Sequence, residues 1–195
     1  LLRDLSAHLQ RPLEIDAVLG TPLLFAPVSF VYRSFGSSSL GGPHVEALSM
    51  LSLPLTVVAF SCSCVLAYRL SKRNPDQAII DGSLWALLAS LCCAKVFSPQ
   101  YLLWLFPLAL ASPGYYRRAV VLALIACSLV AQVWYPTLWR RVLALAPEAT
   151  SLIAVRNVAI VALTIALAIH LWRVGGGEGS AASQPTNRGP VDDTA

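Results

Sequence analysis

Six apolar stretches run along the chain, and most charged side chains collect in the short segments between them. The stretches cover residues 17–33, 45–68, 78–96, 100–112, 118–135 and 150–172. Most are continuous runs rich in Leu and Ala, without the alternation over about ten residues that is typical of membrane-barrel strands. In lipid, a helix pairs its backbone groups within one segment. The pattern therefore predicts an all-α, polytopic integral membrane bundle with five or six apolar helices.

Two of these stretches differ from an ordinary membrane span. The stretch 100–112 is too short to cross about 30 Å of hydrocarbon as a straight helix, so we expect a short or broken helix there. The stretch 17–33 is interrupted by Pro22 and Pro27 and is close to the lower length limit for crossing. A plain crossing at this point would leave residues 1–16 in the cytoplasm.

Composition supports a membrane protein and sets the domain limits. Of the 195 residues, 56% are hydrophobic and 12% are charged, whereas a soluble domain usually carries about 25% charged residues. We expect a transmembrane domain over residues 1–172 and a disordered cytoplasmic tail over 173–195, which is Gly-rich and then polar. The chain starts at Leu1 with a helical pattern, so we expect that it continues a longer protein.

Basic residues divide between the two predicted sides of the membrane. One side would carry Arg69, Lys72, Arg73, Arg117, Arg118 and Arg173, and the other Arg33, Lys95, Arg140, Arg141 and Arg156. The positive-inside rule hardly separates these sets, although we expect the first to be cytoplasmic. The positive charge of the second set indicates either snorkelling into the interface or a phosphate site. No continuous basic stripe is present, so membrane lipids are expected partners and nucleic acid is not.

The segment between the third and fourth stretches carries most of the candidate chemistry. Lys95, Ser98, Gln100 and Tyr101 supply a cation, a hydroxyl, an amide and a phenol around Pro99. Irregular backbone at membrane depth is tolerated only where protein or a water-filled cavity surrounds it. A broken helix with polar groups therefore indicates a binding site. The alternative is an ordinary tight turn with a snorkelling Lys95.

Two further groups of polar residues have open interpretations. Arg156 lies inside the last stretch beside Asn157, where it either snorkels outward or faces inward and binds a phosphate with its planar guanidinium. His8, Arg11 and Glu14 recur at intervals of three near the first stretch. They form either a solvated interfacial helix or one face of an active site.

The remaining chemistry is sparse. The five cysteines lie in apolar segments without the spacing of a zinc site and are expected to be buried thiols. The segment 35–44 is a Gly/Ser-rich loop that we expect to be flexible, and His44 and His170 are isolated. No metalloprotease motif, nucleotide fingerprint or Ser-His-Asp spacing is present, so we expect neither a metal nor a cofactor.

Three segments resemble a known family. The run KVFSPQYLLWLFPLALA (Lys95 to Ala111) resembles a segment of bacterial, mainly actinobacterial, membrane glycosyltransferases of the GT-C type, glycosyltransferase family 87. The segment HLQRPLEIDAVLGTPLLFA and the Arg156-Asn157 pair are also similar to that family. The resemblance covers most of residues 8–172 and identifies the chain as the C-terminal half of such an enzyme.

The resemblance implies a function and a distribution of roles. These enzymes transfer a hexose, commonly mannose, from a polyprenyl-phosphate donor to a lipid or cell-envelope acceptor on the outer face of the plasma membrane. It implies donor or phosphate binding by Lys95, Ser98, Gln100, Tyr101 and Arg156, and an acceptor or active-site face at His8, Arg11 and Glu14. The usual catalytic acidic residue would lie upstream of Leu1, outside this chain.

The resemblance also bears on topology and leaves other functions open. An outer position for residues 11–14 requires the stretch 17–33 to dip into the membrane and return. A polytopic transporter or flippase is one alternative, although the sequence has one broken helix and no internal repeat. A non-catalytic membrane subunit, or a degenerate copy of the enzyme, is the other.

Overall fold

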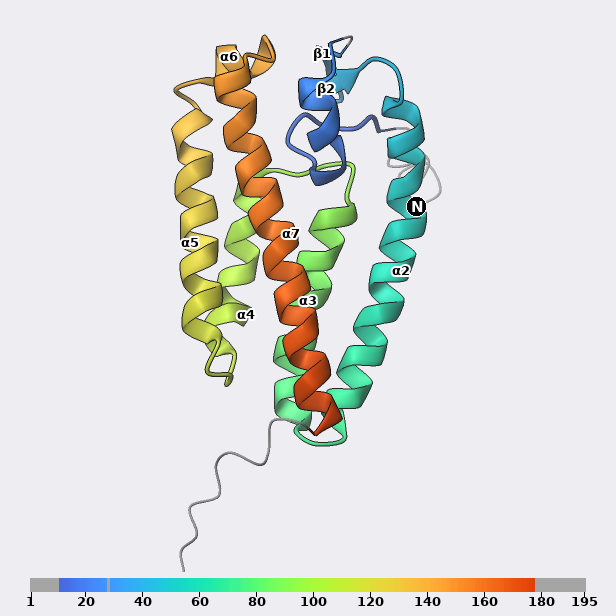
Figure 1. Cartoon of the computed structure of the whole chain (residues 1–195), viewed down its shortest axis with the longest axis vertical. Coiled ribbons are helices and arrows are strands. Elements are labelled where there is room, and N and C mark those ends of the chain that lie inside the picture. Colours follow the sequence, from blue (N-terminus) through green and yellow to red (C-terminus); the bar gives the residue numbers. More distant parts are fainter. Residues whose placement is uncertain (1–10, 28, 178–195) are drawn as a thin grey trace, which may run out of the picture.

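The structure is a computed structural model that describes residues 11–27 and 29–177. Long helices run side by side along the longest axis of the molecule, and a small hairpin covers one end (Figure 1). The helices are α2 (Val45–Ser71), α3 (Pro75–Cys93), α4 (Leu105–Ala111), α5 (Arg117–Trp134), α6 (Trp139–Leu143) and α7 (Pro147–Gly176). The 3-10 helices are η1 (Val18–Phe25) and η2 (Pro99–Trp104), and the strands are β1 (Phe30–Ser34) and β2 (Ser37–Gly41).

Three helices are long and apolar enough to cross a membrane. These are α2, α5 and α7, with 27, 18 and 30 residues, and they correspond to three of the six predicted apolar helices. Helix α3 is not among them, and its first two turns carry Asp76, Gln77 and Asp81. The structure is therefore mostly helical, as predicted.

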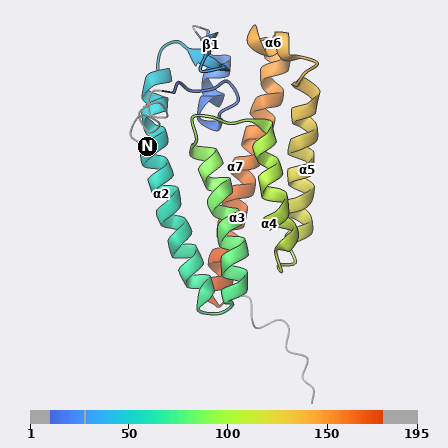
Figure 2. The same cartoon turned by 180° about the vertical axis from the view of Figure 1, so that it is seen from behind.

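The stretch 100–112 forms a broken helix, as its length predicts. Helix η2 begins at Pro99 and passes into α4 at Leu105, and the combined apolar segment ends at Ala111. Helices α3, α4 and α5 are adjacent when the molecule is seen from behind (Figure 2). The short η2–α4 unit therefore lies within the bundle beside its longer neighbours.

Of the two arrangements predicted for residues 17–33, the plain crossing is wrong. The segment forms η1 and then strand β1, which pairs antiparallel with β2 and places Ser34 opposite Ser37. Phe35 and Gly36 between the strands have φ angles of 50° and 76°, the geometry of a tight hairpin turn. The stretch therefore does not cross the bundle but returns to the same end. The segment 35–44, expected to be a flexible loop, contributes strand β2 instead.

The two ends of the bundle differ in content. The hairpin end contains η1, β1, β2 and α6, and the opposite end contains the α2–α3 connection and the end of α7 (Figure 1). Arg69, Lys72, Arg73, Arg117, Arg118 and Arg173 lie toward the opposite end, as the sequence predicts. Arg33, Lys95, Arg140 and Arg141 lie toward the hairpin end.

The end of the last helix differs from the predicted domain limit. Helix α7 continues past residue 172 to Gly176 and is closed by Gly177. Gly177 has a φ of 102°, and its N–H donates to the carbonyl oxygen of Arg173, the left-handed ending that glycine adopts readily. The rest of the predicted tail lies outside the described residues.

Two apolar cores hold the bundle together. The larger lies among α2, α3, α4, α5 and α7 and includes Leu70, Leu84, Leu105 and Leu124. The smaller lies at the hairpin end, where Leu13, Ile15 and Leu40 pack with Trp134 and Ile153. The smaller core fixes the segment before η1 against α5 and α7, and this segment forms one wall of the site described next.

Candidate functional site

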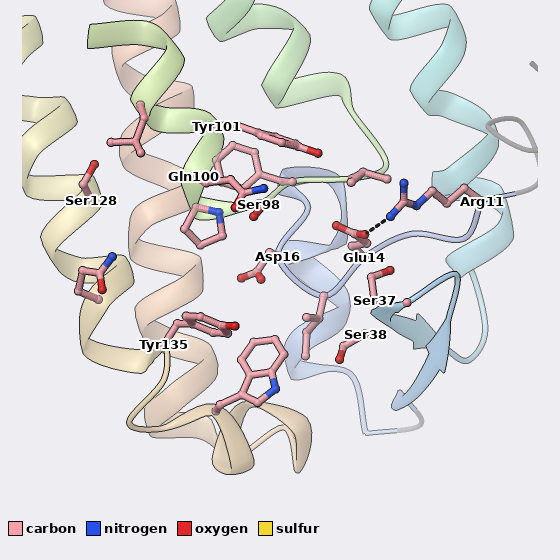
Figure 3. A pocket seen from close by; sticks show the side chains of 18 of the residues that line it. Arg11, Glu14, Asp16, Ser37, Ser38, Ser98, Gln100, Tyr101, Ser128 and Tyr135 are labelled. Atoms are coloured by element: carbon pink, nitrogen blue, oxygen red, sulfur yellow. Dashed lines mark hydrogen bonds and ion pairs between the residues drawn. The ribbon is translucent and has the colours of Figure 1, made fainter. Parts of the chain in front are cut away.

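A polar cavity of about 580 Å³ opens at the hairpin end of the bundle (Figure 3). Its walls come from the segment before η1, the β-hairpin, the α3–η2 connection, and α5 with the turn that follows it. Serine hydroxyls, side-chain amides, tyrosine rings, arginines and carboxylates face this space. The polar lining residues are Arg11, Glu14, Asp16, Arg33, Ser37, Ser38, Ser98, Gln100, Tyr101, Ser128, Gln132 and Tyr135.

The break between α3 and η2 supplies three of the predicted residues. Helix α3 ends at Cys93, and Ser98 has an extended backbone before η2 begins at Pro99. The N–H of Tyr101 donates to the carbonyl oxygen of Ser98 over 2.8 Å, and the Tyr101 ring stacks on Trp104 at 4.7 Å between centroids. Ser98, Gln100 and Tyr101 therefore line one wall of the cavity.

Arg11 and Glu14 lie on the facing wall as an ion pair. Nη2 of Arg11 is 3.1 Å from Oε1 of Glu14, and the Glu14 residue is only 7% exposed. The backbone N–H of Glu14 donates to the carbonyl oxygen of Lys95 over 2.9 Å, and that of Ile15 donates to Ser38 over 3.0 Å. These bonds hold the segment between the hairpin and the α3–η2 connection. His8, the third residue of this predicted group, lies outside the described residues.

Lys95 does not line this polar cavity. It lines a neighbouring cavity of about 640 Å³ with Tyr32, Glu46 and Met50, and Arg11 takes part in the walls of both cavities. The backbone carbonyl oxygen of Lys95 accepts the hydrogen bond from the N–H of Glu14, as described above. Lys95 therefore lines a different cavity from Ser98, Gln100 and Tyr101, which the sequence placed with it.

Arg156 faces inward, so the snorkelling interpretation is wrong. The residue is 1% exposed, and its guanidinium lies over the ring of Phe97 at 4.2 Å. Nη2 donates to the carbonyl oxygen of Asp16 over 2.6 Å and to Oδ1 of Asn157 over 2.8 Å. These contacts tie α7 to the segment before η1. Arg156 is not part of the cavity lining, so the structure places it behind the wall, against Phe97 of the α3–η2 connection.

Asn157 extends the same anchor. Its Nδ2 donates to Oγ1 of Thr21 over 2.8 Å, and its Oδ1 also accepts from Nε of Arg156 over 3.0 Å. Thr21 belongs to η1, so the Arg156-Asn157 pair holds both η1 and the residues before it. The position of one cavity wall therefore depends on two polar residues inside α7.

Asp16 is a site residue that the sequence interpretation missed. Its carboxyl group lies in the cavity in Figure 3, and Oδ1 is 3.7 Å from Nη2 of Arg156. Oδ1 is buried without a hydrogen-bond partner among the described residues. Burial raises the pKa of Asp16 from its ordinary 3.8 to about 6, with Arg156 opposing and Glu14 adding to the rise. Alternation could have identified it: Leu13 and Ile15 are buried in the core, while Glu14 and Asp16 face the cavity.

Arg33 adds a second positive charge at the cavity. It comes from strand β1, is solvent-exposed, and forms no ion pair with any residue in 11–27 or 29–177. Arg11, by contrast, is already paired with Glu14. The cavity therefore combines one paired and one unpaired guanidinium, a group that binds phosphate through parallel N–H donors.

An apolar groove of about 300 Å³ adjoins the polar cavity. It is lined by Leu87 and Leu91 of α3 and by Ala94, the residue that caps this helix. Trp104 and Leu105 complete the lining. Arg11, Val96 and Tyr101 line both the groove and the cavity. A polar space and an apolar space thus meet at one arginine and one tyrosine, a combination that suits an amphiphilic ligand.

Comparisons with known proteins identify no relative of this chain. No protein-family model, no curated protein and no solved structure matches the chain.

Proposed function

We propose that this chain is part of a multi-pass plasma-membrane glycosyltransferase that uses a polyprenyl-phosphate sugar as donor. It would transfer a hexose, with mannose as the first candidate, to a lipid or cell-envelope acceptor on the outer face of the membrane. The observation that supports this proposal is the polar cavity joined to an apolar groove at Arg11, Val96 and Tyr101. A polyprenyl-phosphate sugar has the same division into a polar head and an apolar chain.

The lining chemistry suits the head of such a donor. Arg33 and Arg11 can hold the phosphate through charge-assisted hydrogen bonds. Hydroxyl and amide groups such as those of Ser98 and Gln100 can donate to or accept from sugar hydroxyls. In this proposal the sugar lies between the α3–η2 connection and the β-hairpin, and the phosphate that it carries points toward Arg11.

The apolar groove suits the first part of the chain. Its walls are mostly apolar, with side chains from Leu87, Leu91, Trp104 and Leu105. An isoprenoid segment that moves from the lipid into this groove therefore stays in apolar surroundings. Leu87 and Trp104 are exposed on the bundle surface. A donor could therefore enter from the bilayer with its chain still in lipid.

The two other predicted cations have different places in this proposal. Lys95 acts from the neighbouring cavity, where it adds positive charge next to Arg11. Arg156 supports the cavity wall and is not a phosphate ligand in this proposal, because it does not line the cavity and its Nη2 donates to Asp16 and Asn157. With the hairpin end outside, the six basic residues at the opposite end are cytoplasmic.

The head-group part of the proposal is tested with Arg11→Ala and Arg33→Ala. The full-length protein is placed in membrane vesicles with radiolabelled polyprenyl-phosphate mannose and a membrane extract as acceptor. Each variant should lower kcat/KM at least about tenfold, since charge-assisted hydrogen bonds contribute about 1.5–3 kcal/mol. Arg141→Ala is the matched control, because Arg141 lies at the same end and pairs with Glu148 outside the cavity.

The chain-binding part is tested with Ser90→Phe, which fills the groove. We expect KM for a long-chain donor to rise, whereas a donor with a very short chain is affected less. Ser83→Phe, two turns earlier on α3 and outside the groove, is the control. Normal transfer by Arg11→Ala, Arg33→Ala and Ser90→Phe would contradict the proposal. Movement of the lipid across sealed vesicles without transfer would favour a flippase.

A further inference from the structure

A second groove, of about 600 Å³, lies between α2 and α3 and reaches their connection, at the end of the bundle opposite the hairpin (Figure 1). Mostly small side chains line it, and the larger Tyr68 and Ile79 beside it are 63% and 70% exposed. The two helices pack closely at Gly82, where an added β-carbon would lie 3.2 Å from that of Ala67. This α2–α3 groove therefore exists because its residues are small, and it is open to the surroundings of the bundle.

The groove is mainly apolar, although it contains serines. Oγ of Ser63 donates to the carbonyl oxygen of Ala59 over 2.8 Å, and Oγ of Ser71 donates to that of Tyr68 over 2.9 Å. Both hydroxyl protons are thus bonded within α2. Along α3 the groove covers residues 75–86, which is about 16 Å of helix and close to half of the hydrocarbon thickness of about 30 Å. This length suits one acyl chain of a single bilayer leaflet.

Lys72 lies at the end of the groove next to the α2–α3 connection. It caps α2, and its Nζ is 4.5 Å from the centroid of the Tyr68 ring. Since this ring also lines the groove, the cation–π contact holds the ammonium group at the edge of the groove. Helix α2 is one of the candidate membrane spans and ends at Ser71. The charge of Lys72 is therefore at the depth of the lipid head groups.

Two arginines add to the positive charge at this end. The guanidinium of Arg69 lies over a tryptophan ring of α7 at 3.7 Å, and that of Arg73 lies against the glycine that caps α7. Neither arginine, nor Lys72, forms an ion pair with any residue in 11–27 or 29–177. The first turn of α3 contributes one acidic residue, Asp76. Three cations thus face one acid beside the α2–α3 connection.

We infer that the α2–α3 groove binds an anionic phospholipid, with the phosphate at Lys72 and one acyl chain between the helices. The Lys72 ammonium donates to the phosphate in a charge-assisted hydrogen bond, and the chain packs over Ala67 and Gly82. Basic residues at the membrane surface favour anionic over zwitterionic lipids. A groove of small residues also suits a helix of another protein, but the cations at its end favour a phosphate. The inference is independent of the proposed function, because it uses no residue of the cavity at the hairpin end.

The test uses the full-length protein in lipid nanodiscs that contain equal amounts of phosphatidylglycerol and phosphatidylcholine. After transfer to detergent, native mass spectrometry counts the lipids that stay bound. A phosphatidylglycerol with a photoreactive group in its acyl chain is crosslinked in parallel, and the attachment site is mapped by peptide mass spectrometry. The wild-type protein should retain phosphatidylglycerol in preference to phosphatidylcholine, with crosslinks in residues 63–71 or 75–86.

Two variants separate the head group from the chain. Lys72→Ala should lower the preference for phosphatidylglycerol about fivefold, whereas Arg118→Ala, exposed at the same end in α5, should leave it nearly unchanged. Cys64→Phe fills the groove from an exposed position on α2 and should abolish the crosslink. Cys62→Phe is its matched control, because Cys62 is exposed on the same helix outside the groove.

Three results would overturn the inference. The first is equal retention of the two lipids by the wild-type protein. The second is an unchanged preference and an unchanged crosslink in both Lys72→Ala and Cys64→Phe. The third is a groove that holds a helix of another protein and no lipid. Each of them leaves the proposed function intact, since glycosyl transfer plays no part in these measurements.

Discussion

The guanidinium of Arg156 in α7 donates to the backbone carbonyl oxygen of Asp16 over 2.6 Å, although the two residues are 140 positions apart in the sequence. The same guanidinium lies over Phe97, which precedes η2. A single buried side chain thus contacts the segment before η1, the α3–η2 connection and the last helix. Two of the elements that build the cavity, the segment before η1 and the α3–η2 connection, therefore depend on it.

Replacement of Arg156 should therefore destabilise the whole hairpin end. Arg156→Ala removes the cation from a buried pair and leaves Asp16 and Asn157 without their donor. Breaking such a pair costs about 3–5 kcal/mol, so we expect a clear drop in the Tm of the detergent-purified protein. Arg141→Ala, in an exposed pair with Glu148, should cost at most about 1 kcal/mol. Equal Tm values for the two variants would contradict the anchoring role.

Much of the helical structure follows from the sequence because it depends on local pattern. The runs that form α2, α5 and α7 are long and apolar, so lipid exposure and backbone pairing leave few alternatives to a helix. The broken helix at Pro99 also follows, because the apolar run after it is too short to cross. Ser98, Gln100 and Tyr101 reach the cavity through that break.

The hairpin end was harder to predict because its contacts are distant in the sequence. The segment 17–33 is apolar like a membrane helix, but β1 pairs with a Ser-rich strand that by itself resembles a loop. The direction of Arg156 is set by Asp16, which no local pattern connects to it. Asp16 itself ends a polar segment at the start of an apolar stretch, and only its alternation with the buried Leu13 and Ile15 marks it in the sequence.

The stability of the protein should depend on pH through Asp16. Its pKa is raised by burial from 3.8 to about 6 in the folded protein, so between these values the folded state binds more protons than the unfolded state. Stability contributed by Asp16 is therefore greatest below about pH 4 and declines as the pH rises through 6. The Tm difference between pH 5 and pH 7.5 should shift accordingly in Asp16→Asn compared with the wild type. An identical difference in both proteins would show that Asp16 does not titrate in this range.

The hairpin turn contains a residue in an unfavourable conformation. Phe35 has a φ of 50° and its side chain is 57% exposed, so no burial offsets the backbone cost. A left-handed conformation costs most residues about 1–2 kcal/mol, but asparagine adopts it more readily. Phe35→Asn should therefore raise the Tm, and Gly36→Ala at a φ of 76° should lower it. If Phe35→Asn instead lowers the Tm, the Phe35 ring makes a stabilising contact that outweighs the backbone term.

A buried carboxylate away from the cavity gives a further prediction. Asp81 of α3 is 0% exposed, and within residues 11–27 and 29–177 its carboxylate has the neutral phenol of Tyr116 as a neighbour and forms no ion pair. Burial of a charge without an opposite charge is unfavourable, so Asp81→Asn, which can still bond to the Tyr116 phenol, should leave the Tm unchanged or raise it. Glu14→Gln is the contrasting variant, since Glu14 is paired with Arg11 at 3.1 Å. A marked loss of stability in Asp81→Asn alone would show that the Asp81 carboxylate makes a favourable interaction in the membrane-embedded protein.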